Sequence, residues 1–229
     1  MAVYFQHPDI FFYFCMLNFE QHELNSMKIE HLPDHIVYSP PVIEFVTVTA
    51  ETCLFLEHAV DLSREEFVNK SVKILALLYL KTSLLEIPSR VYDDETERFV
   101  NEEDYNDIKG QVEAILGEQD SYLETFHPDM ALSDTPIAAF VSENLADVYQ
   151  ELKDFAANYQ LADTDVMNDA LVTCLEAFGE HWGQKTLNAL RALHNIKYSG
   201  QIYEDEADKN SHAGKLDRNN FVNFLREDD

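Results

Sequence analysis

The sequence is poor in the residues that mark many familiar classes of protein. Among 229 residues it has three cysteines, six glycines and one tryptophan, and 16 basic residues stand against 43 acidic ones. Cys15, Cys53 and Cys174 are far apart and odd in number, which argues against a disulfide framework and favours a reducing, cytoplasmic setting. No phosphate-cradling glycine loop, serine nucleophile elbow or His-Glu-x-x-His motif occurs. The sequence therefore predicts no cofactor and points to no catalytic residue.

Long apolar runs are also missing. The run IFFYFCML at residues 10–17 has only eight residues, too few to span a bilayer, and it lacks the basic flank and cleavage site of a secretory signal. We hypothesise that residues 1–26 lie outside the natural fold, with Met27 as the natural start. The alternative is a short helix docked on the body. The intact mass of protein made from the native gene distinguishes the two.

The net charge of −27 restricts the partners that the protein can bind. Such a surface repels nucleic-acid phosphates and anionic lipid, so we expect neither direct nucleic-acid binding nor membrane binding. It favours a basic protein partner, divalent cations or solubility alone. The acids are densest at residues 92–107. This stretch follows one predicted helix, and its second part begins the next. The candidate acidic surface comprises Asp93, Asp94, Glu95, Glu97, Glu102, Glu103, Asp104 and Asp107.

Helical periodicity runs through the middle of the chain. Apolar residues recur at spacings of three and four, which predicts an all-α bundle of about five main helices plus short helices. Pro40 and Pro41 suit a first helical turn, and Ser63 with Glu66 forms a capping box for a second helix, which we expect to be central. We also expect a short helix at 121–126, and a long helix that starts near Thr135 and ends near residue 159.

The domain organisation follows from these patterns. Residues 1–36 are expected to be an N-terminal extension, 37–200 the helical bundle and 201–229 a polar tail. Within the tail, Phe221, Phe224 and Leu225 are spaced for one small amphipathic turn.

The last long helix, predicted over about 163–199, changes its buried face along its length. Trp182 lies on its apolar line, but the flanking apolar side chains change sides between Gly179 and Gly183. Either a kink near the glycines or a change of packing partner along a straight helix would explain this change.

A polar line on the same helix is the candidate ligand or partner site. Arg191 could hold a carboxylate or phosphate in a fork, and neighbouring side chains could add hydrogen bonds. The alternative is the solvated face of an amphipathic helix. Metal chemistry has no comparable support, because the one Glu-x-x-His pair, Glu124 with His127, stands directly before Pro128. The candidate line comprises His181, Gln184, Asn188, Arg191 and Asn195.

Three stretches carry a resemblance to a known family. They are ILGEQDSYLETF, DVYQELKDF and WGQKTLNALRALH, at residues 115–126, 147–155 and 182–194. They resemble an uncharacterised bacterial family of acidic helical proteins that is catalogued as a domain of unknown function. The resemblance spans about 37–199 and implies a helical cytoplasmic protein. It implies no activity, substrate or catalytic residue.

Two functional hypotheses follow. The first is a non-catalytic interaction module whose acidic surface or polar helix line binds a protein partner. A narrower form is an acidic protein that mimics phosphates and occupies a nucleic-acid-binding protein. The second is an enzyme or small-ligand binder that uses the polar line around Arg191. Salt-sensitive binding to a basic protein would support the first hypothesis, because salt screens exposed charges. A concave pocket at the polar line would support the second.

Overall fold

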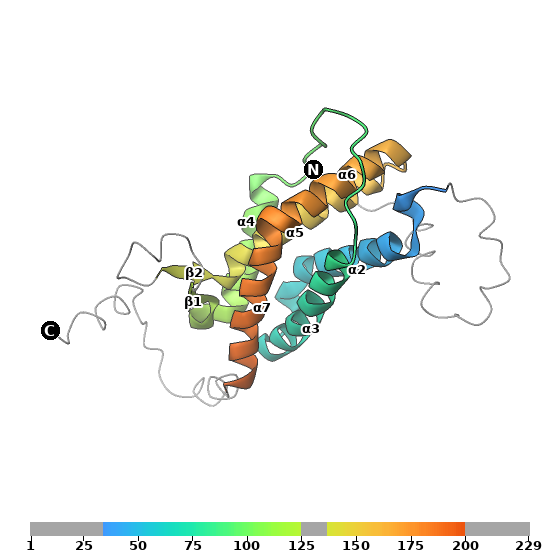
Figure 1. Ribbon diagram of the computed structural model, residues 1–229. Helices are drawn as coiled ribbons and strands as arrows, with labels where there is room; N and C mark the ends of the chain where they lie inside the picture. Colours follow the sequence, from blue (N-terminus) through green and yellow to red (C-terminus); the bar gives the residue numbers. More distant parts are fainter. Residues whose placement is uncertain (1–33, 125–136, 200–229) are drawn as a thin grey trace, which may run out of the picture.

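A computed structural model describes residues 34–124 and 137–199 (Figure 1). The predictions that concern Met27 and the turn at 221–225 therefore lie outside the described residues. The predicted all-α bundle is confirmed, with one small two-stranded sheet added. The helices are α2 (Pro40–Glu57), α3 (Arg64–Ser83), α4 (Glu102–Leu116), α5 (Val141–Tyr159), α6 (Thr164–Ala177) and α7 (Gly183–Tyr198).

Polar residues fix where the helices begin. Pro40 and Pro41 occupy the first turn of α2, as predicted. The capping box of α3 is also confirmed, since the Ser63 hydroxyl accepts from the Glu66 N–H at 3.3 Å and the Glu66 carboxylate accepts from the Ser63 N–H at 3.2 Å. Asn101 caps α4 by the same kind of arrangement.

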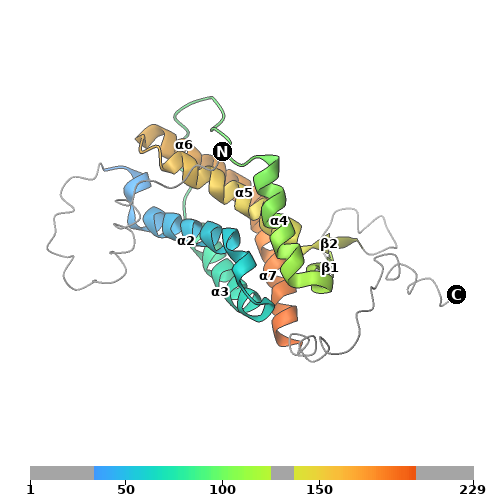
Figure 2. The same ribbon diagram turned by 180° about the vertical axis from the view of Figure 1, so that it is seen from behind.

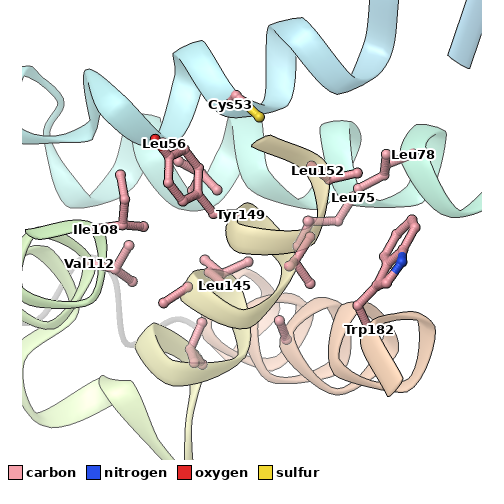
Figure 3. Packing of buried hydrophobic residues seen from close by; sticks show 14 of the residues in the cluster. Cys53, Leu56, Leu75, Leu78, Ile108, Val112, Leu145, Tyr149, Leu152 and Trp182 are labelled. Atoms are coloured by element: carbon pink, nitrogen blue, oxygen red, sulfur yellow. The ribbon is translucent and has the colours of Figure 1, made fainter. Parts of the chain in front are cut away.

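Helix α5, and not α3, is the central helix. It contacts α2, α4, α6 and α7, and Figure 3 shows Leu145, Tyr149 and Leu152 among side chains of the surrounding helices. The prediction that α3 is central is wrong, because within the described residues α3 packs mainly on α2 and α7 and leaves leucines on its outer side exposed. No helix among the described residues is long and apolar enough to cross a membrane. Leu77 and Leu80 of α3 are 43% and 52% exposed, and Leu84, which caps the end of the helix, is 65% exposed.

A two-stranded antiparallel sheet precedes α5. Strand β1 (Ser121–Leu123) pairs with β2 (Ala138–Phe140), with Tyr122 opposite Ala139. The predicted short helix at 121–126 and the predicted helix start near Thr135 are therefore wrong, because 121–123 and 138–140 are extended and the helix begins at Val141. Pairing between distant segments satisfies the backbone there, which local periodicity cannot indicate. The buried Asp120 carboxylate accepts from the N–H and the hydroxyl of Ser142, both at 2.7 Å.

A π-helical turn, Phe178–Trp182, joins α6 to α7. Figures 1 and 2 both show the chain bending between α6 and α7, as π-turns commonly allow. The packing partners also change, because α6 lies against α5 whereas α7 packs on both α3 and α5. The first explanation, a kink near the glycines, is therefore confirmed; the packing partner changes at the same place, but not along a straight helix. Trp182 is fully buried, and its indole N–H donates to the Cys174 carbonyl at 2.9 Å.

Candidate functional site

An extended segment, residues 85–101, connects α3 to α4; we call it the strap. Pro88 lacks the N–H that a continuing helix would need, and Figure 1 shows the strap as the dark green trace that passes α6 on its way to α4. All eight residues of the candidate acidic surface are exposed, four on the strap and four near the start of α4. None of the eight forms an ion pair with another described residue.

Asp169 of α6 holds the first half of the strap. Its two carboxylate oxygens accept from the N–H groups of Val91 and Tyr92, each at 2.7 Å, and the side chain is almost fully buried. Burial alone would raise the pKa of this carboxyl. The two backbone donors, the Asn168 amide and the nearby Arg90 outweigh burial and lower the pKa below its usual value. Asp169 is therefore a buried anion whose role is to fix backbone.

Asp154 and Asn158 of α5 hold the second half of the strap. Asp154 Oδ1 accepts from the N–H groups of Phe99 and Val100 at 2.7 and 2.9 Å. The Asn158 amide donates to the Glu97 carbonyl at 2.7 Å. With Asn168, whose amide donates to the Ser89 carbonyl at 2.8 Å, four buried polar side chains fix the backbone of the strap.

The two arginines of the strap face the helices. Arg90 contacts α6, donating to Glu176 at 2.7 Å and to the Thr173 hydroxyl at 3.2 Å. Arg98 is held more loosely. Its Nη1 lies 3.8 Å from Glu151 Oε1 and 3.9 Å from Asp154 Oδ2, and its side chain is 59% exposed. Both cations pair with carboxylates of α5 and α6, so neither neutralises the four acids of the strap.

A cleft of about 290 Å³ lies between the strap and these two helices; we call it the strap cleft. Residues 93–98 form one wall, Glu151 and Asp154 come from α5, and Thr173 and Cys174 come from α6. Burial raises the pKa of the Glu151 carboxyl, and the nearby Arg98 only partly offsets this effect. Asp154 Oδ2 is buried and has no hydrogen-bond partner. The cleft is therefore acidic and contains a carboxylate oxygen with unused capacity.

The candidate line on α7 does not line the strap cleft. The side chains of Gln184 and Asn188 hydrogen-bond to each other at 3.1 Å, and the Asn188 amide also donates to Glu124 at 3.1 Å. Arg191 and Asn195 are exposed farther along the helix. The line therefore stays a prediction, and part of its hydrogen-bonding capacity is used within the protein.

His181, the first residue of that line, lies beside a separate polar cluster around Asp147. Its Nε2 is 4.0 Å from Asp147 Oδ2, whereas Lys185 Nζ is 3.0 Å from the same oxygen. The Tyr105 hydroxyl donates to Asp147 Oδ1 at 2.9 Å. This cluster ties α4, α5 and α7 together. In the described part of the chain, no group of three or more His, Cys, Asp or Glu side chains is placed to hold a metal ion.

Sequence reasoning missed the residues that build the strap cleft. Glu151, Asp154 and Asn158 recur at spacings of three and four along α5, the same period as the apolar stripe beside them. A polar line beside the clearest apolar stripe of the sequence was the available signal. It indicated a polar neighbour packed against α5, although it could not identify the strap.

Fold and site together define a helical bundle that carries an acidic strap anchored by buried polar side chains. The chain belongs to the family described as a domain of unknown function (DUF5063), whose model matches residues 36–199. The crystal structure of protein BF1032 from Bacteroides fragilis is similar, with 44% sequence identity and a TM-score of 0.65. That match covers 72% of this chain and 97% of the other. No curated protein matches the chain. The resemblance that the sequence carried is confirmed.

Proposed function

We propose that the protein is a non-catalytic cytoplasmic interaction module that binds a basic protein through the strap and the start of α4. The observation that carries this proposal is the anchoring of the strap. Four buried side chains fix its backbone, while its four acids are exposed and form no ion pair with a described residue. The acidic surface is thus presented in one conformation and does not need to be ordered on binding.

Anchoring supports binding for an energetic reason. A flexible acidic segment loses conformational freedom when a partner orders it, at about 1–2 kcal/mol per residue for the backbone alone. A segment that is already fixed avoids much of that loss. Uncompensated negative charge also attracts a basic partner over a distance and raises the rate of encounter. The two buried thiols, Cys53 and Cys174, support a reducing compartment.

Charge-matched variants test the proposal. In the strap variant, Asp93, Asp94, Glu95 and Glu97 become the corresponding amides. In the control variant, four exposed acids elsewhere become glutamine: Glu51, Glu65, Glu118 and Glu180. Tagged wild type and both variants are used to capture proteins from lysate of the host at low salt, followed by a stepped salt wash.

We expect a stoichiometric basic protein that wild type and the control variant retain, that the strap variant loses and that salt releases. Because both variants have the same net charge, this difference isolates the position of the charge. Equal loss in both variants would mean that only overall charge matters. Retention by the strap variant would refute the proposal.

A further inference from the structure

We infer that the strap cleft binds one guanidinium or ammonium group, a lysine or arginine side chain of the basic partner, with Asp154 Oδ2 and Glu151 as its acceptors. This inference rests on the proposed function and specifies where the partner inserts. It concerns the two carboxylates that α5 contributes to the cleft, whose wall the four exposed acids of the strap also line.

The main support is an unsatisfied buried oxygen. Asp154 is only 8% exposed, and its Oδ1 is fully used by the N–H groups of Phe99 and Val100. Its Oδ2 makes no hydrogen bond, although a buried carboxylate oxygen without a partner is costly. A donor group that enters the cleft would satisfy this oxygen. Buried polar atoms without partners are uncommon enough in folded proteins to need a reason, and a ligand position supplies one.

The charge of the cleft indicates that its ligand is a cation. Its lining holds six carboxylates and two guanidinium groups, a formal charge of −4, and Arg90 is committed to Glu176 and Thr173. The described residues offer no cluster of three or more suitable ligands for a metal ion. An organic cation, which needs hydrogen-bond acceptors and not a full coordination shell, is therefore the better fit.

Arg98 marks the position that the partner's cation would take. Its Nη1 lies 3.8 Å from Glu151 and 3.9 Å from Asp154 Oδ2, beyond hydrogen-bonding distance of both. An incoming guanidinium could approach both carboxylates at hydrogen-bonding distance and in a forked geometry. Because the Arg98 side chain is 59% exposed, it can swing outward without breaking a hydrogen bond.

Calorimetric titration with N-acetyl tetra-arginine amide at low salt tests the inference. We expect Glu151→Gln to weaken binding at least tenfold, while Glu51→Gln, an exposed change of the same charge on α2, changes it less than twofold. We expect Arg98→Gln to strengthen binding several-fold, and more than Lys73→Gln, which removes an exposed charge from α3. Asp154 stays unchanged because it also anchors the strap. The amide resonances of Phe99 and Val100 should shift when the peptide binds.

Other results would overturn the inference in distinguishable ways. If Glu151→Gln behaves like Glu51→Gln while the strap variant still loses the peptide, the cleft inference fails and the proposed function stands. No binding of the peptide to wild type would overturn the inference, whereas the capture experiment with the strap variant decides the proposed function. A parallel titration with spermidine tests whether the cation comes from a protein side chain or from a free polyamine. Spermidine that binds as tightly as the peptide, with the same dependence on Glu151, would overturn a partner side chain as the ligand.

Discussion

Asp169→Asn is the sharpest test of how the strap is held. The two carboxylate oxygens accept from two adjacent backbone N–H groups, those of Val91 and Tyr92, each at 2.7 Å. Asparagine has nearly the same shape, but its NH2 group would face one of these donors. The variant therefore removes one charge-assisted hydrogen bond and leaves one N–H of the strap without its acceptor.

The expected decrease in stability follows from the loss of that one hydrogen bond. A hydrogen bond to a charged group contributes about 1.5–3 kcal/mol, so we expect the free energy of unfolding to fall by about that amount. For a chain of this size, each kcal/mol lowers Tm by roughly 2–4 °C. Asp165→Asn is the matched control, because it makes the same change at an exposed position one turn earlier in α6. Its cost should stay below about 1 kcal/mol, the size of a helix-dipole effect.

Urea unfolding followed by fluorescence of the buried Trp182 measures the global effect, and hydrogen exchange at Val91 and Tyr92 measures local release of the strap. The pH dependence adds a further check. Because the folded pKa of Asp169 is lowered, its stabilisation is present above the unfolded pKa of about 3.9 and is lost as pH falls through the folded pKa. The difference between wild type and Asp169→Asn should therefore shrink below about pH 4.

Two results would refute this reasoning. The first is an Asp169→Asn variant that loses no more stability than Asp165→Asn. The second is unchanged exchange at Val91 and Tyr92, which would show that their N–H groups are protected by something other than the carboxylate of Asp169.

Three further predictions concern the bundle. Gly183→Ala should lower the free energy of unfolding in urea by about 1–3 kcal/mol, because the new Cβ would lie 2.5 Å from the Phe178 carbonyl oxygen. In the control Gly179→Ala the new Cβ meets nothing within 4 Å, so the free energy of unfolding should stay the same or rise. Raising ionic strength from ~0.01 to ~1 M should raise Tm, since screening weakens repulsion among the acids, and a fall in calorimetric Tm would contradict this. Cys53 and Cys174 should resist iodoacetamide at pH 8 until the protein unfolds, because burial raises the pKa of both thiols, that of Cys53 to about 12; labelling of the folded protein, located by peptide mass, would contradict this.

The parts of the fold that depend on local periodicity and capping could be predicted from the sequence. The α2 start at Pro40 and the capping box of Ser63 were predictable because each uses neighbours within a few residues. The burial of Trp182 followed from its place on an apolar helical line. The bend near Gly179 and Gly183 was one of two predicted alternatives.

Features that depend on distant residues were not predictable. Strand β2 forms only because 121–123 lie beside it, and α3 is peripheral because its described neighbours, mainly α2 and α7, leave its outer face exposed. The acids of the strap were singled out from composition. Asp154 and Asp169 were not, because a buried aspartate that binds backbone N–H groups 55 and 78 residues away cannot be told from a solvated one by spacing alone.

Those separations have a consequence for how the chain is made. Asp169 is synthesised 78 residues after Val91, which at 5–20 residues per second corresponds to roughly 4–16 s. During that interval the nascent strap has left or is leaving the ribosome without its anchors. Its dense negative charge keeps it hydrated and repels other nascent chains of the same sequence. The charge that we assign to partner binding in the finished protein would thus also protect the newly made segment from premature association.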